Sequence, residues 1–343
     1  MPFRSNFSTN SISIPIYGVE QYGHGCNNRL NCRISWKCWC EEVPPHPSCS
    51  HRIHRNTEVV VLKGDFAVIL AILLLPLFIR DSFVVSTATL AVIYSILSLS
   101  WFFMEKEAGW NSLAHSIPFG IAAYAIAINP ALIIPAFSLS ILLFTAISFF
   151  GRDKFVFTSF IIAIVLWYLS HYITLSLNGK VTGGEEGFSF QSIGLWESYL
   201  LSSSVLLIFF TSFLLLRRTG LGLKIEAVRD DEIAARSIGI HAFKVRIVSF
   251  TISVFAATVA GICYLLYFGH VSPEIFSIEV ALLPFVASLI AGNRWISPII
   301  GCYIIVIVSR AFSGILPETH LLIYAAVLIL SPKLRRWWNA STH

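Results

Sequence analysis

The sequence predicts an all-α, polytopic helical membrane protein with about ten spans and both termini in the cytoplasm. Of the 343 residues, 56% are hydrophobic and 13% are charged, whereas a soluble domain averages about 25% charged residues. Apolar stretches of about 18 or more residues recur along the chain, as bilayer-crossing helices require. The net charge is +5, and the basic residues concentrate in loops and tails. They therefore set orientation and do not indicate nucleic-acid binding.

Residues 1–60 differ in composition from the rest of the chain. They hold five of the 7 cysteines and four histidines: Cys26, Cys32, Cys38, Cys40, Cys49, His24, His46, His51 and His54. Cys38 and Cys40 are weak candidates for a metal site, because both thiolates could reach one ion. No two cysteines have the separation of a zinc knuckle, so we predict no metal site. We expect a Cys/His-rich extension that is disordered, or a mis-assigned start.

Residues 61–336 form the expected membrane domain, and residues 337–343 form a cytoplasmic tail. The expected spans are 65–79, 83–104, 112–128, 131–150, 155–177, 199–216, 247–268, 280–291, 296–308 and 321–330. Polar turns separate them, such as Asn129-Pro130 and Arg152-Asp153-Lys154. The later stretches are short for a bilayer that needs about 20 helical residues. We therefore expect tilted, flank-extended or partly re-entrant helices in the C-terminal half.

The charges between the spans give a consistent orientation. If residues 217–246 are cytoplasmic, alternation places most other basic residues inside: Lys106, Arg152, Lys154, Arg294, Lys333, Arg335 and Arg336. Alternation places these acidic residues outside: Glu185, Glu186, Glu197, Glu274 and Glu318. Arg80 and Arg310 oppose the positive-inside rule.

Residues 220–240 are the longest polar, mixed-charge segment after the first sixty residues. We expect a short helix there, with Asp230 as its N-cap and Gly239 ending it in the left-handed conformation. Asp231 and Glu232 place negative charge on its first turn. An apolar patch is expected beside Arg236 and Ser237, formed by Ala234, Ala235 and Ile238. A helix this small needs a partner surface, and the alternative is an ordinary solvated loop.

The expected spans carry no acidic residue near their middle. An ion-coupled secondary transporter, which usually needs intramembrane ionisable groups, is therefore the less favoured alternative. A membrane-embedded enzyme would need a histidine and a carboxylate within hydrogen-bond reach, such as His115 or His171 with Glu105 or Glu107. No metal-protease spacing supports that alternative.

Ser272-Pro273-Glu274 predicts the start of a helix on the outer side. Ser is a strong N-cap, Pro suits the first helical position and an acid in the first turn suits the dipole. Discontinuous helices at membrane depth often line substrate paths. A surface helix between two spans is the alternative.

Several segments together resemble one family. Residues 227–240, which read AVRDDEIAARSIGI, closely resemble the cytoplasmic signature of LivM-type permeases, the membrane subunits of branched-chain amino acid ABC transporters. Further similar segments are SLAH at 112–115, FGIAAY at 119–124, TGGEEG at 182–187, VAG at 259–261 and GHVSPE at 269–274. Ala114 and Ala122 stand where the family has glycines, and residues 107–111 and 291–295 also depart from its pattern.

The resemblance implies an importer subunit that couples solute movement to ATP hydrolysis on other chains. The residues implied in ATPase coupling are Arg229, Asp230, Asp231, Glu232, Ala234, Ala235, Arg236 and Gly239. Those implied in the translocation path or substrate binding are His115, Gly120, Tyr124, Ser272, Pro273 and Glu274. No catalytic residue is expected, and no GxxxxGK[ST] sequence is present.

The resemblance also implies partners and a location. The expected partners are a second, LivH-like permease, two cytoplasmic ABC ATPase subunits, an external solute-binding protein and membrane lipid. No nucleic acid is expected. ATP and magnesium would bind the ATPase subunits, and this chain would hold no cofactor. The expected location is the plasma membrane of a prokaryote, and the expected solutes are Leu, Ile or Val, with urea or short amides as alternatives.

Overall fold

The computed structural model describes residues 64–76, 78–79, 81–177, 180–290, 294–312, 324–325, 327 and 329, with only the backbone described at 175–177 and 180–182. The chain divides into two units, Met1–Leu62 and Lys63–His343, and every described residue belongs to the second. Cys38, Cys40, the tail 337–343 and most of the expected span 321–330 lie outside the described residues.

The described part of the chain is mostly helical. Five helices in it are long and apolar enough to cross a membrane: α3 (Ser82–Lys106), α5 (Ile133–Ser148) extended by the 3-10 turn η1 (Pro130–Leu132), α6 (Arg152–Ser170), α7 (Leu195–Leu216) and α10 (Ala242–Phe268). Four shorter apolar helices correspond to other expected spans: Gly64–Pro76, α4 (Ser116–Ile128), α11 (Ile278–Ile290) and α12 (Ser297–Phe312).

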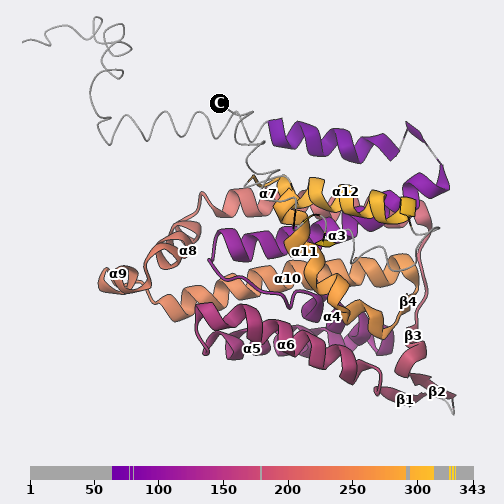
Figure 1. The fold of residues 1–343 in the computed structure, drawn as a ribbon, viewed down its shortest axis with the longest axis horizontal. Coiled ribbons are helices and arrows are strands. Elements are labelled where there is room, and N and C mark those ends of the chain that lie inside the picture. The colour runs from indigo at the N-terminus through magenta and orange to yellow at the C-terminus, as the bar shows by residue number, and fades with distance from the viewer. Residues whose placement is uncertain are drawn as a thin grey trace, which may run out of the picture. The chain divides into compact units, whose positions relative to one another are not determined.

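Helices α3 and α10 form the centre of the bundle, where the long helices run side by side (Figure 1). Helix α3 packs against α7, α10, α11 and α12, while α10 packs against α3, α4, α5 and α7. A close approach of α10 to α4 depends on Gly261, because a Cβ there would lie 2.0 Å from the Phe119 carbonyl oxygen. Helix α6 lies at the periphery and exposes large apolar side chains such as Phe157 and Ile161, as a lipid-facing helix does.

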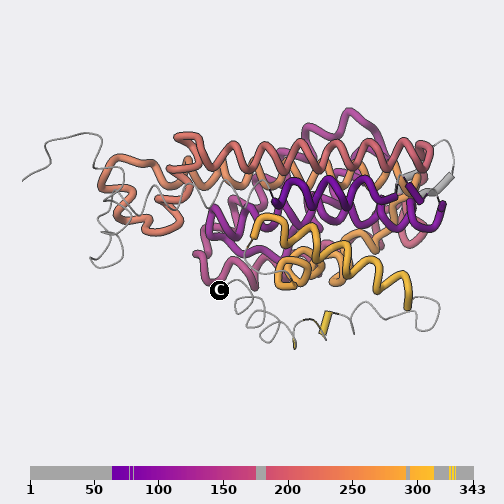
Figure 2. The backbone as a smooth tube through the Cα atoms, turned by 90° about the horizontal axis from the view of Figure 1, so that it is seen from above, coloured from indigo at the N-terminus to yellow at the C-terminus, as the bar shows by residue number. Residues whose placement is uncertain are grey.

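The two ends of the bundle carry different structures. Helices α8 (Gly220–Asp230) and α9 (Glu232–Ser237) project beyond one end (Figures 1 and 2). Short strands lie at the other end: β1 (Thr174–Leu177) pairs with β2 (Lys180–Gly183), and β3 (Phe188–Ser189) pairs with β4 (His270–Val271), both antiparallel. The 3-10 turns η2 (Gly184–Glu186) and η3 (Pro273–Phe276) adjoin these strands.

The strands correct the expectation of a purely helical chain with a span over 155–177. Helix α6 ends at Ser170, and Thr174 already pairs with Gly183 in the β1–β2 hairpin. The sequence contains a hairpin signal at this point, because Asn178-Gly179 separates the two strands and Asn-Gly favours a two-residue hairpin turn. The expected loop after the span is therefore partly an ordered sheet.

Candidate functional site

The segment between α7 and α10 folds as two short helices joined at Asp231. Asp231 has an extended backbone (φ −151°, ψ 109°), and its Oδ1 accepts hydrogen bonds from the backbone N–H groups of Ile233 (2.8 Å) and Ala234 (3.0 Å). The N-cap of α9 is therefore Asp231, and the expectation that Asp230 caps it is wrong. Helix α8, which the sequence analysis did not predict, continues through Asp230 and moves the cap by one residue. Gly239 has φ +85°, the left-handed conformation that the sequence predicts.

The apolar face of α9 also differs from the predicted patch. Ala235 is buried and packs with Val228 of α8 and Ala242 of α10. The large apolar side chains exposed at this helix are those of Ile233 in α9, which is 81% exposed, and of the C-cap residue Ile238, which is 74% exposed. Ala235 therefore holds α9 to the chain's own helices, while Ile233 and Ile238 remain open to a partner.

Glu232 connects α9 to the first turns of α10. Its carboxylate pairs with Arg236 one turn further along α9 and with Arg246 of α10, whose Nη2 lies 3.0 Å from Oε1 and 3.1 Å from Oε2. The Arg246 side chain is only 13% exposed, and its guanidinium lies 4.6 Å from the ring centroid of Trp110. Arg246 is therefore held between a carboxylate and an aromatic face.

Trp110 has a second arginine on its ring. The Arg152 guanidinium lies 5.6 Å from the Trp110 centroid. Its Nη1 donates to the Arg229 carbonyl (2.9 Å) and its Nη2 donates to the Val228 carbonyl (3.4 Å). These are among the last carbonyls of α8, which attract cations because they have no partner within the helix. We call Trp110, Arg152 and Arg246 the tryptophan clamp.

Arg229 fixes the same end of α8 to the end of α3. Its Nη1 donates to the Lys106 carbonyl at 2.7 Å, and its guanidinium also pairs with Asp230 at 2.8 Å. Gly109 follows α3 with φ +71°, and a Cβ there would lie 2.6 Å from Arg229 Cγ. The implied coupling residues Arg229 and Glu232 therefore join the α8–α9 segment to helices α3, α6 and α10.

Glu107 makes a separate link between α3 and α7. Its Oε1 lies 3.0 Å from Arg217 Nε, and its side chain is 7% exposed. Burial raises the pKa of the Glu107 carboxyl, while the positive charge of Arg217 opposes that rise. The Glu107 carboxylate therefore forms an ion pair with Arg217. In the described region, neither Glu107 nor any other carboxylate is bonded to His115.

His115 is a packing residue in this structure. It is buried, its ring lies edge-on to Phe144, and its Nε2 lies 2.9 Å from Ser253 Oγ. Ser253 donates its single hydroxyl proton to the Ser100 carbonyl, so Nε2 carries the proton that bonds to Ser253. This chain of bonds ties α4 to α10 and α3. A histidine–carboxylate pair, which the membrane-enzyme alternative requires, is not formed at His115.

The implied translocation residues Gly120 and Tyr124 lie together on α4 against η3. A Cβ at Gly120 would lie 2.3 Å from a ring carbon of Phe276, and the Tyr124 ring lies 5.5 Å from that of Phe276. Pro273 takes the first position of η3, but Ser272 makes no side-chain cap. In place of the helix expected after Val271, the chain forms the short 3-10 turn η3, which ends before Ser277. Ser277 has an extended ψ of 159°, and a separate helix, α11, begins at Ile278.

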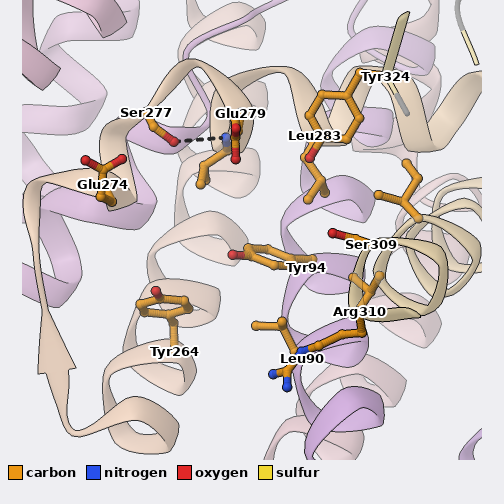
Figure 3. Close-up of a pocket in the computed structure, with 13 residues that line it drawn as sticks. Leu90, Tyr94, Tyr264, Glu274, Ser277, Glu279, Leu283, Ser309, Arg310 and Tyr324 are labelled. Carbon is orange, nitrogen blue, oxygen red and sulfur yellow. Dashed lines mark hydrogen bonds between the residues drawn. The ribbon is translucent and has the colours of Figure 1, made fainter. Parts of the chain in front are cut away.

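A cavity of about 610 Å³ lies among α3, α10, η3, α11 and α12, with Tyr324 also in its wall (Figure 3). Of the implied translocation residues only Glu274 lines it. Its other polar lining includes Tyr94, Tyr264, Glu279 and Arg310, which the sequence analysis did not select. The sequence marked Arg310 as unusual, because it opposes the positive-inside rule. Glu279 was not marked, because it stands at the edge of an apolar stretch, where acidic residues are common.

Comparison with known proteins assigns the family. The family described as "Branched-chain amino acid transport system / permease component" matches residues 83–332, well over half of the chain. The high-affinity branched-chain amino acid transport system permease protein LivM of Escherichia coli (strain K12) is 30% identical over 134 residues, and that of Salmonella typhimurium (strain LT2) is 29% identical over the same length. The aligned part spans 38% of this chain and 32% of each relative. No solved structure matches the chain significantly. The resemblance in the sequence is thereby confirmed, and the chain belongs to the family of branched-chain amino acid transport permease components.

Proposed function

We propose that this chain is the membrane-spanning permease subunit of a binding-protein-dependent ABC importer, with branched-chain amino acids as its solutes. It has about ten spans and both termini in the cytoplasm, and it resides in the plasma membrane of a prokaryote. Residues 61–336 form the permease domain, residues 1–60 an extension and residues 337–343 a tail. Family membership and the five long apolar helices of the described region support a multi-pass transport subunit.

The observation that carries this proposal is the α8–α9 segment. It lies beyond one end of the spans and presents Ile233 and Ile238 outward, while the tryptophan clamp and Arg229 fix it to three spans. Exposed isoleucines on a short helix outside the lipid are costly in water unless a partner covers them. The occupant that we propose is a cytoplasmic ABC ATPase subunit.

The proposed mechanism is mechanical. Movement of the ATPase subunits displaces α9, and the Glu232–Arg246 pair and the tryptophan clamp pass that displacement to α10 and α6. Arg229 passes it to the end of α3. The chain itself performs no chemical reaction. ATP and magnesium bind the partner ATPase subunits, a second LivH-like permease completes the path, and an external binding protein delivers the solute to the end that carries the strands.

Co-purification tests the proposal. The full chain is expressed with ABC ATPase subunits, extracted in detergent and captured by a tag. We expect the ATPase to co-purify with the wild type and to be lost from Ile233→Asp, because a carboxylate at an 81% exposed position spoils an apolar contact without disturbing the fold. Leu223→Asp on α8, where the side chain is 61% exposed, is the matched control and retains the ATPase. Absence of any ATPase from the wild type, or equal capture by Ile233→Asp, contradicts the proposal.

A further inference from the structure

The cavity shown in Figure 3 has a polar end whose charge is uncompensated. Glu274 of η3 and Glu279 in the first turn of α11 both line it. Among the residues that the structure describes, neither carboxylate has an ion pair or a side-chain hydrogen bond. Arg310 also lines the cavity but lies at the other end, with the Tyr94 ring between it and Glu279 (Figure 3). Glu274 is exposed and Glu279 is half-buried, and the end of the cavity near the two carboxylates is therefore negative.

Three tyrosines also line the cavity and add aromatic rings and hydroxyl groups to the two carboxylates. Tyr94, Tyr264 and Tyr324 all line the cavity, and the Tyr94 and Tyr264 rings lie 6.5 Å apart. The Tyr94 hydroxyl points into the cavity (Figure 3) and bonds to no described residue. Carboxylates together with tyrosine faces and hydroxyls are a recurring environment for ammonium groups, because both attract a compact cation.

The remaining wall is aliphatic. Leu90, Val280, Leu283, Ile305 and Val306 line it. The cavity volume of about 610 Å³ falls within the range of about 300–1,000 Å³ that small-molecule sites occupy. A solute that fits this wall and the negative end carries an ammonium group on an aliphatic skeleton.

We propose that this cavity is a solute-binding site in which Glu274 and Glu279, with Tyr94 and Tyr264, hold the ammonium group and the aliphatic wall takes the side chain. The proposal rests on the proposed import function and deepens it, because it assigns recognition of the solute to residues of this chain. It also separates ammonium-bearing solutes from neutral ones, since urea and simple amides offer these carboxylates no charge.

Binding to the purified full-length chain tests the site without any partner. The probes are L-leucine, 3-methylbutylamine, which is leucine without its carboxylate, and 4-methylpentanoate, which is leucine without its ammonium group. Titration calorimetry in detergent is expected to show binding of the first two and none of the third. Glu279→Gln and Glu274→Gln are each expected to weaken leucine binding about tenfold or more, because each removes a charge-assisted contact.

Glu185→Gln is the matched control, since Glu185 lies in η2 near the same end of the bundle, is exposed and does not line the cavity. It is expected to bind leucine as the wild type does. Thermal unfolding without ligand shows that each Gln variant is folded before its affinity is interpreted. Three results overturn the site: no leucine binding by the wild type, binding of 4-methylpentanoate as tight as that of leucine, or unchanged affinity in both Gln variants.

The leucine-binding experiment and the ATPase co-purification can fail independently of each other. If the ATPase co-purifies and leucine affinity is unchanged in the variants, the site is wrong and the import function stands. If leucine binds as described and no ATPase is captured, the site stands and ATP-driven import is wrong.

Discussion

The replacement of Arg246 by lysine tests how α9 is fixed to the spans. Lysine keeps the positive charge beside Glu232 but loses the guanidinium that lies 4.6 Å from the centroid of the Trp110 ring. A desolvated cation–π contact contributes about 2 kcal/mol, and lysine is not a conservative replacement for an arginine held against an aromatic ring. We therefore expect Arg246→Lys to lower the free energy of opening α9 by about 2 kcal/mol, roughly a thirtyfold larger open population.

Native-state amide hydrogen exchange measures this opening. The amides to follow are those of Ile233, Ala235 and Ile240, which are bonded within the α9 turn. We expect them to exchange roughly thirty times faster in Arg246→Lys, with α10 amides unchanged. Arg236→Lys is the matched control, because Arg236 also pairs with Glu232 but is 63% exposed, and exposed pairs contribute little. Equal exchange in the wild type and Arg246→Lys, or an equal effect of both substitutions, refutes the assigned role of the clamp.

Three further predictions concern local features. Asp231→Ala removes the α9 cap and costs about 1 kcal/mol, visible as faster α9 amide exchange, whereas Asp230→Ala leaves that exchange unchanged. Gly261→Ala puts a methyl group 2.0 Å from a backbone oxygen of α4 and is expected to lower the melting temperature in detergent through overpacking of about 1–3 kcal/mol. Gly220→Ala is the control and is expected to leave the melting temperature unchanged, because a Cβ at Gly220 meets open space. Burial raises the pKa of Glu107 above its usual 4.5, so the folded state binds that proton more tightly than the unfolded state. Its contribution to the free energy of unfolding is therefore lost as pH rises from 4.5 through the raised pKa. Denaturation curves measured over this pH range are expected to show the loss in the wild type and not in Glu107→Gln.

The helical membrane class and the position of the α8–α9 segment could be predicted because both depend on composition and on charge placed between apolar stretches. The short strands were missed because the run before Asn178 is apolar enough to continue a helix, and only pairing across the hairpin decides between the two. The break at Ser277 was missed for a related reason. Ser272-Pro273-Glu274 has a sound helix-start pattern, but a helix start does not predict where the helix stops.

The outward face of α9 could not be predicted from sequence, because it depends on how α9 packs against α8 and α10. Ala234 and Ala235 are indistinguishable as residues, yet Ala235 is 3% exposed and Ala234 is exposed. A charge at Ala235 would break the chain's own packing, so loss of a partner from such a variant would not identify a docking face. The cavity was missed because Tyr94, Tyr264 and Glu279 come from three helices far apart in sequence. Only Glu274 had a local pattern that selected it.

Uptake into liposomes shows whether this chain works as a subunit of an ATP-driven importer. The full chain is reconstituted in liposomes with its permease and ATPase partners and the external binding protein, and radiolabelled leucine entry is followed with ionophores present. We expect uptake that requires ATP and the binding protein, persists when ion gradients are abolished, and is lost in Ile233→Asp but not in Leu223→Asp. Uptake that proceeds without ATP and stops when an ion gradient is abolished would contradict ATP-driven import and identify an ion-coupled carrier.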